Sequence, residues 1–156
     1  MTVRFNIRKA CRDDVPHIVR LLANDPLGKQ REYYSEPLLD QYYTAFAEID
    51  ADKNNYLIVI EDDKKIVGTS QLTIITHLTY QGSKRGQIEG VRIDESHRGK
   101  GIGTQMIDWA INKSRELGCN MVQLTMDKKR HDTIEFYQKI GFEASHEGLK
   151  LLLNHK

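Results

Sequence analysis

Residues 98–104 read Arg98-Gly99-Lys100-Gly101-Ile102-Gly103-Thr104, and this glycine-rich turn joins a predicted strand to a predicted helix. Its alternating glycines let the backbone pass close to a ligand and adopt torsions that a Cβ would forbid. The first amides of the following helix lack intrahelical acceptors and lie at the positive end of the helix dipole. With Arg98 and Lys100 beside them, such amides are typical of a site for a pyrophosphate or another anion.

The spacing of the glycines limits which phosphate-containing ligand this turn could bind. A Walker loop needs Gly-x-x-x-x-Gly-Lys followed by Ser or Thr, which this stretch lacks. A dinucleotide-binding turn needs Gly-x-Gly-x-x-Gly and an acidic residue roughly 20 residues later. Asp127 lies near the end of the next predicted strand, but the glycines recur at every second residue and too little chain follows for another half-sheet. Dinucleotide binding is therefore the weaker interpretation, and the residues alone leave the anion open.

The segments around the turn predict a mixed α/β domain. Apolar alternation and apolar runs predict strands at residues 3–8, 56–60, 66–76, 86–93, 121–126, 142–144 and 149–153. Apolar residues at helical spacing predict helices after Asp13 or Asp14 and over residues 39–49, 101–117 and 132–140. This order gives an antiparallel first half and one β-α-β crossover in the second. Because no repeat or linker divides the chain, we expect a single domain over residues 1–156.

Composition excludes several classes of protein. The 156 residues are 39% hydrophobic and 29% charged, which is typical of one globular domain, and the net charge of +1 gives no support for a nucleic-acid partner. The N-terminus lacks the apolar core of a signal peptide and no apolar run could cross a bilayer, so we expect a cytoplasmic protein without a membrane partner. Cys11, Cys119 and the six histidines match no metal-ligand spacing, and we expect no metal.

Three segments in the same order resemble the signatures of the GNAT superfamily of N-acetyltransferases. The segments are Arg98-x-x-Gly101-x-Gly103, residues 87–93 (Gln-Ile-Glu-Gly-Val-Arg-Ile), and Phe136-Tyr137-x-x-x-Gly141-Phe142. The order of predicted elements also agrees with that family over nearly the whole chain. The resemblance implies a GNAT-like α/β fold, with a mixed, mostly antiparallel central sheet, a β-α-β acetyl-CoA-binding crossover and about four flanking helices.

The resemblance further implies that acetyl-CoA is the acyl donor. Its pantetheine arm would lie between the fourth and fifth strands and pair with backbone groups of Val91 and Ile93, while amides of the glycine turn would hold the pyrophosphate. Many family members carry Asn seven residues before the tyrosine; here Arg130 stands there and would contact a phosphate or the acceptor. The cofactor-binding residues implied are Val91, Ile93, Arg98, Gly99, Lys100, Gly101, Ile102, Gly103, Thr104, Arg130 and Tyr137.

Two residues are candidates for the chemistry. An alkylammonium has a pKa of about 10.4 in water, so the acceptor amine must lose a proton before it attacks. Glu89, on the predicted fourth strand, is the candidate general base, directly or through a water; the alternative is a plain ion pair with a neighbouring cation. Tyr137 is, by the resemblance, the candidate general acid for the departing thiolate. On spacing alone, its Phe-Tyr pair is typical of core packing.

The acceptor is the least determined part. Residues 129–132 and 145–146 resemble the aminoalkylphosphonate N-acetyltransferase branch, and an anionic acceptor would suit Arg130 or Arg92. The loop after the first helix and residues 76–83 are expected to bind the acceptor. The candidates there are Arg31, Tyr33, His77 and Tyr80.

Three functions follow as hypotheses from this sequence. The first is N-acetylation of a primary amine of a small molecule. The second is acetylation of a protein or peptide, and the third is a CoA-binding transcriptional regulator without turnover. Members of the family are often dimeric, which leaves a homodimer open.

Overall fold

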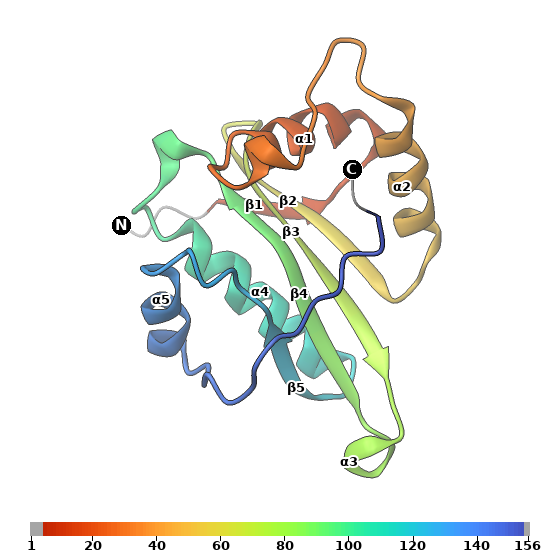
Figure 1. The fold of residues 1–156 in the computed structure, drawn as a ribbon, viewed down its shortest axis with the longest axis vertical. Helices are drawn as coiled ribbons and strands as arrows, with labels where there is room; N and C mark the ends of the chain where they lie inside the picture. The colour runs from red at the N-terminus through yellow and green to blue at the C-terminus, as the bar shows by residue number, and fades with distance from the viewer. Residues whose placement is uncertain (1–4, 155–156) are drawn as a thin grey trace.

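The computed structural model describes residues 5–154, which form a five-stranded sheet with helices on both faces (Figure 1). The strands lie in the order β1-β2-β3-β4-β5; the first four are antiparallel and β5 is parallel to β4. Their bounds are Asn6–Lys9 for β1, Asn55–Asp62 for β2, Lys65–Thr76 for β3, Lys84–Ile93 for β4 and Cys119–Leu124 for β5. The predicted first strand began at residue 3, and residues 3 and 4 lie outside the described part of the chain.

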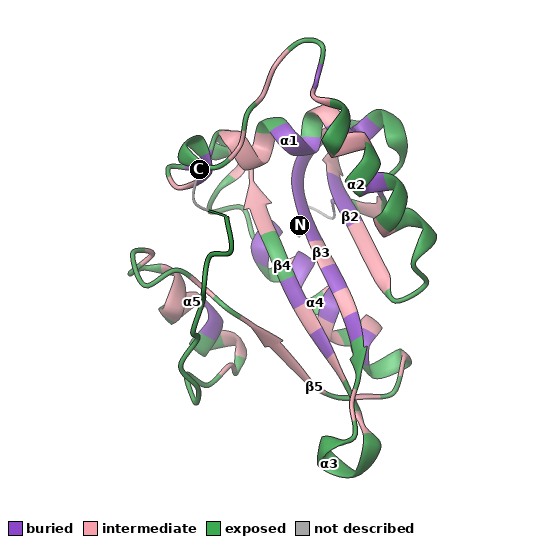
Figure 2. Ribbon diagram, turned by 45° about the vertical axis from the view of Figure 1, so that its right-hand side comes forward, coloured by how far each residue is buried: buried purple, intermediate pink, exposed green. Residues whose placement is uncertain are grey.

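The helices divide between the two faces of the sheet. Their bounds are Val15–Ala23 for α1, Asp40–Ala51 for α2, Ile102–Glu116 for α4 and Thr133–Ile140 for α5. The side chains of α1 and α2 form a core cluster with Val59, while those of α4 pack with Ile60, Leu72 and Ile88 on the other face, joined by Tyr137 of α5. Figure 2 shows the buried residues of β2, β3 and β4 between these layers. The predicted mixed fold is confirmed.

Two connections between strands have positive backbone φ values. Asp63 and Lys64 join β2 to β3 with φ of 47° and 65°, as in the two-residue turns that match strand twist, so β2 and β3 form a hairpin within the predicted antiparallel first half. The connection from β3 to β4 contains a short helical turn, α3 (Thr79–Gly82), which the sequence did not predict. Tyr80 and Gln81 there have φ of 51° and 62°.

A bulge interrupts the pairing of β3 with β4. Gln71 lies opposite Glu89 and Thr69 lies opposite Arg92, so one residue of β3 faces two residues of β4 between these pairs. Gly90 occupies this bulge with φ of 63°, a conformation that glycine adopts without steric cost. The bulge therefore shifts the alternation of side chains along the rest of β4.

The shift decides which side chains of β4 point toward α1. Ile88 packs in the core beneath α4, and beyond the bulge Val91 and Ile93 pack there as well. Strict alternation would instead have placed Arg92 with Ile88. Because of the bulge, Glu89 and Arg92 both lie on the side of α1, where Glu89 adjoins α1 residues and Arg92 adjoins the carboxylate of Asp25.

The parallel pair β4–β5 is only half formed. Its register runs from Lys84 opposite Cys119 to Ile88 opposite Leu124. Beyond Ile88, β4 continues to Ile93 while the chain after Leu124 leaves the sheet. Within the described residues, no strand covers this edge of β4 after Ile88, which is the separation of strands that the family resemblance implied.

The last two predicted strands, over residues 142–144 and 149–153, are wrong. Residues 142–153 contain no strand, and β5 is the edge of the sheet in the described part of the chain. Leu149, Leu151, Leu152 and Leu153 are between 69% and 94% exposed. An apolar run forms a strand only where it finds a backbone partner and a surface to cover, and this segment meets neither.

We expect Gly68→Ala to destabilise the protein by about 1–3 kcal/mol, as overpacking of a filled core does. A Cβ at Gly68 would lie 2.5 Å from Cγ2 of Ile60 and 3.2 Å from the carbonyl oxygen of Arg92. Thermal unfolding followed by circular dichroism measures the change. Gly148→Ala is the matched control, because a Cβ there meets no atom within 4 Å. Equal unfolding midpoints for the two variants would show that the site near Gly68 is not tightly packed.

Candidate active site

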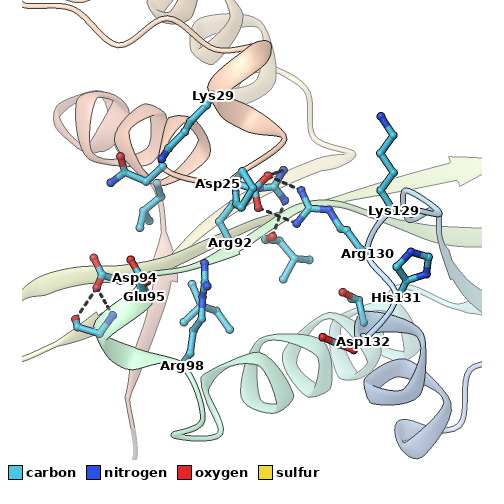
Figure 3. A pocket seen from close by; sticks show the side chains of 17 residues that line it. Asp25, Lys29, Arg92, Asp94, Glu95, Arg98, Lys129, Arg130, His131 and Asp132 are labelled. Carbon is cyan, nitrogen blue, oxygen red and sulfur yellow. Dashed lines mark hydrogen bonds and ion pairs between the residues drawn. The ribbon is translucent and has the colours of Figure 1, made fainter.

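A cavity of about 1270 Å³ opens where β4 loses its β5 partner (Figure 3). Its walls come from the end of α1 with the loop that follows, from residues 91–98, and from residues 129–133 before and at the start of α5. Three segments far apart in the sequence therefore meet at one place. The cavity has space for a large ligand that lies along the open edge of β4.

The carboxylate of Asp25 accepts four hydrogen bonds at the wall of this cavity. Arg130 donates two hydrogen bonds to its carboxylate, from Nη1 to Oδ1 at 2.7 Å and from Nη2 to Oδ2 at 2.5 Å. The amides of Leu27 and Gly28 also donate to Oδ2, at 3.2 and 3.0 Å. Burial raises the pKa of Asp25, but these donors and the charge of Arg92 outweigh it and lower the pKa to about 2. An ionised Asp25 thus ties the loop after α1 to the loop before α5.

Arg92 is a half-buried cation with few partners. Its Nη1 donates to the carbonyl oxygen of Val91 at 2.8 Å, and its Nη2 lies 3.7 Å from Oδ2 of Asp25. The Nε is buried and has no hydrogen-bond partner within the described residues. Burial lowers the pKa of Arg92, Asp25 raises it, and Arg130 lowers it again. The positive charge of Arg92 is therefore only partly compensated.

Tyr137 lies beside the two arginines. The residue is 8% exposed, and its ring packs edge-on against Phe136 and Phe142 at centroid distances of 5.1 and 5.7 Å. Burial raises the pKa of Tyr137, while the charges of Arg130 and Arg92 lower it by less. The hydroxyl is therefore protonated at neutral pH and could donate a proton.

Glu89 lies on the same side of β4 as Arg92, three residues earlier. Its side chain is exposed and lines a smaller cavity of about 150 Å³ with Leu22 and Gly90. No hydrogen bond or ion pair to its carboxylate occurs within residues 5–154, so the described part of the chain does not show the plain ion pair considered as an alternative role. An exposed, unpaired carboxylate is free to accept a proton.

The glycine turn combines two structural demands. Gly99 and Gly101 have φ of 76° and 81°, which favours glycine at both positions, and Gly101 precedes α4 without a side chain to cap the helix amides. Gly103 is buried, and here close packing favours glycine, because a Cβ would lie 3.2 Å from Ile93 and 3.3 Å from the Phe136 ring. Arg98, Gly99, Lys100 and Thr104 are exposed, and Arg98 lines the large cavity. The open edge of β4, the cavity and this turn together fit a long ligand that ends in phosphates.

The candidate acceptor residues fall into two groups. Arg31 and Tyr33 are exposed in the loop after α1, and Arg31 is near enough to Arg92 to lower its pKa. His77 and Tyr80 lie in the β3–β4 connection, at the opposite end of the sheet from α1 (Figure 1). None of the four residues lines the cavity, and only Arg31 lies near enough to it to act on a lining residue.

Sequence reasoning missed Asp25 as a site residue. The segment Asp25-x-x-Gly28 carries a local signal, since an Asp side chain often accepts from amides two and three residues later. Nothing in the sequence indicates that its other partner is Arg130, which is 105 positions away.

Two further findings concern the described residues as a whole. No group of three His, Cys, Asp or Glu side chains among them could hold a metal ion. None of their helices combines the length and apolar character that a membrane span requires.

Comparisons with known proteins agree with this geometry. The probable glucosamine 6-phosphate N-acetyltransferase of Drosophila melanogaster is 30% identical over 106 residues, 67% of this chain and 47% of that protein. The aminoalkylphosphonate N-acetyltransferase of Salmonella typhimurium (strain LT2) is 25% identical over 140 residues, 90% of this chain and 86% of that one. The chain spans only 47% to 61% of the length of three curated relatives that it matches.

A solved structure is more similar still. The crystal structure of a protein from Bacillus halodurans C-125, described as a transcriptional regulator, has 49% sequence identity and a TM-score of 0.94 over 96% of this chain and 100% of that one. The family described as Acetyltransferase (GNAT) family matches residues 24–142. The match covers most of the sheet, the glycine turn and α5, and this chain therefore belongs to the GNAT family.

Proposed function

We propose that this protein is an N-acetyltransferase that moves the acetyl group of acetyl-CoA to the primary amine of a small molecule. The observation that carries the proposal is the open edge of β4, which lies in a cavity that extends to Arg98 at the start of the glycine turn. Backbone groups of Val91 and Ile93 would hold the pantetheine arm, and the turn amides with Arg98 and Lys100 would hold the pyrophosphate. The thioester supplies the reactive acyl group, and the protein supplies position and electrostatics.

The chain's own residues would move the protons. The amine nitrogen attacks the thioester carbonyl carbon, the carbon–sulfur bond breaks, and the CoA sulfur leaves. Glu89 would take the proton of the amine, directly or through a water, and Tyr137 would give its hydroxyl proton to the sulfur. Burial keeps the hydroxyl of Tyr137 protonated, and the carboxylate of Glu89 is exposed on the face of β4 that faces α1; these two observations support the roles.

The identity of the acceptor is better supported as a small molecule than as a protein. The two relatives named N-acetyltransferases above are named for small phosphorylated or phosphonylated amines. In addition, the Asp25–Arg130 pair joins two walls of the cavity, which favours a compact acceptor over an extended peptide. A protein or peptide acceptor remains the alternative within the same chemistry.

A regulator without turnover is the second candidate, because the Bacillus halodurans relative is described as a transcriptional regulator. The net charge of +1 argues against DNA binding by this domain. A gel shift with duplex DNA at low and moderate salt tests the point. We expect no shift, whereas a salt-sensitive shift would favour the regulator.

Thiol release from acetyl-CoA across a panel of amines and peptides tests the proposed function. We expect release that depends on a small primary amine and scales with enzyme concentration. Calorimetric titration with acetyl-CoA is run in parallel. Tight binding of acetyl-CoA with no release for any acceptor would contradict the transferase and support the regulator.

Glu89→Gln is expected to flatten the acid limb of the pH–rate profile, because the amide cannot accept the proton that the carboxylate accepts. The measurement is kcat/KM for the amine between pH 5 and 9. Glu48→Gln, which removes an exposed carboxylate on α2, serves as the control and should leave the profile unchanged. An unaltered acid limb in Glu89→Gln would assign the base to another group.

A further inference from the structure

Arg92 has unused capacity to bind an anion. Its side chain is 17% exposed and lines the large cavity, yet its contact with Asp25 is long at 3.7 Å and its Nε has no partner. Apart from the bond from Nη1 to the carbonyl oxygen of Val91, its donors are poorly used, and this is costly because each lost interaction with water must be replaced. The residue therefore needs a further acceptor at the place where a ligand would lie.

Asp25 does not fill that need. Its two carboxylate oxygens already accept the paired bonds from Arg130 and two backbone amides. The charge of one carboxylate is thus shared between two guanidinium groups. Nearby, Arg31 adds positive charge and Glu32 negative charge, and Glu32 already accepts a hydrogen bond from Tyr42. On the cavity wall, Lys29 and Lys129 add positive charge and Asp132 adds negative charge, while Asp94 and Glu95 line the part near Arg98. The cluster around Asp25 therefore keeps a positive surplus.

The surplus lies on the acceptor side of β4. The bulge at Gly90 turns Arg92 toward α1, the same side as Glu89, whereas the glycine turn leads into α4 on the opposite face. Arg130, fixed by Asp25, and Tyr137 adjoin Arg92 from the α5 side. An anion held by Arg92 would therefore lie on the face of β4 that carries Glu89, and not at the pyrophosphate turn on the other face.

We propose that Arg92, together with the Asp25-bound Arg130, binds a phosphate or phosphonate group of the acceptor, so that the substrate is a small primary amine with such a dianion. The planar fork of a guanidinium can donate two hydrogen bonds to two oxygens of a phosphate or phosphonate, and two such groups can bind one anion together. The surplus charge of the cluster favours a dianion over a carboxylate. Asp25 acts here as a positioning residue that holds Arg130 in place. This inference rests on the proposed transferase function.

Three acceptors of the same carbon skeleton test the inference: ethanolamine, O-phosphoethanolamine and 2-aminoethylphosphonate, with β-alanine as the carboxylate counterpart. For the unmodified protein we expect kcat/KM at least about tenfold higher for the phosphate and phosphonate than for ethanolamine, since a charge-assisted bond contributes enough for such a factor. An equal advantage for β-alanine would overturn the assignment to a phosphate or phosphonate.

Arg92→Gln should abolish the advantage, raising KM for the two phosphorus-containing amines about tenfold or more while KM for acetyl-CoA stays unchanged. Lys84→Gln removes an exposed charge from the far end of β4 and should leave all values unchanged. Matching thermal midpoints for the two variants exclude misfolding as the cause. If Arg92→Gln instead raises KM for acetyl-CoA alone, the anion belongs to the donor and the inference is wrong.

A direct binding measurement separates this inference from the proposed function. Calorimetric titration with 2-aminoethylphosphonate should show binding to the unmodified protein and at least about tenfold weaker binding to Arg92→Gln. If ethanolamine supports thiol release while 2-aminoethylphosphonate neither binds nor has a higher kcat/KM, the anion site is overturned and the transferase function stands. Absence of thiol release for every amine would overturn the transferase, while phosphonate binding lost in Arg92→Gln would still support the site.

Discussion

Tyr137→Phe is expected to lower kcat at least about tenfold with little change in the affinity for acetyl-CoA, since a positioned general acid contributes a factor of roughly 10² to 10⁴. Burial raises the pKa of Tyr137 and keeps its hydroxyl protonated, although the charges of Arg130 and Arg92 lower that pKa by a smaller amount. Phenylalanine keeps the ring that packs against Phe136 and Phe142 and removes only the proton donor. The loss should therefore appear in the chemical step and not in folding.

Pre-steady-state thiol release gives the rate of the chemical step for Tyr137→Phe, and calorimetry gives its acetyl-CoA affinity. Tyr43→Phe on α2 removes a hydroxyl from a residue that does not line the cavity and should behave as the unmodified protein. Unchanged turnover in Tyr137→Phe would remove this residue from the mechanism and leave it as a packing residue.

The second large effect is expected for Asp25→Ala, which should destabilise the protein by about 3–5 kcal/mol, as removal of one partner of a buried ion pair does. The substitution leaves Arg130 and Arg92 close together without their shared carboxylate and leaves the amide of Gly28 without an acceptor. Chemical unfolding at pH 7 measures the loss. Asp50→Ala, which breaks the exposed pair with Lys9, is the control and should cost about 1 kcal/mol or less.

The effect of Asp25 should depend on pH with a definite sign. Its pKa falls from 3.8 to about 2 on folding, so the ionised carboxylate contributes roughly 2 kcal/mol of stability above pH 3.8. That contribution is lost as the pH falls toward 2. The difference in unfolding free energy between the unmodified protein and Asp25→Ala should therefore shrink between pH 5 and pH 2. A constant difference over that range would show that the ionised state of Asp25 contributes little.

Local signals predicted most of the fold. Gly99 and Gly101 mark a turn that needs positive φ, and this signal depends on neighbouring residues alone. The final strands were wrongly predicted because residues 149–153 have a strand-like composition but no partner edge. The pairing of two strands depends on segments that are distant along the chain, so the composition of one segment cannot predict it.

The sequence points to single residues of the candidate site but not to how they are arranged, because the arrangement also depends on distant segments of the chain. The sequence singled out Glu89, Tyr137 and Arg130 individually, through motif and resemblance. Their arrangement depends on the bulge at Gly90, which a lone glycine in a strand only hints at. The role of Asp25 depends on a partner that approaches in the folded chain, so residue spacing could not reveal it.

Because β4 is only half paired, the stability of the folded chain should depend on the concentration of the ligand that pairs with its open edge. Backbone amides along its open edge can exchange their hydrogens with solvent more readily than those of the paired strands. A ligand that pairs with this edge acts as an additional strand and slows that exchange. Binding to the native state alone adds about 2.7 kcal/mol of stability when the free ligand is at 100 times its dissociation constant. The lifetime of the folded chain would then rise and fall with the supply of its acyl donor.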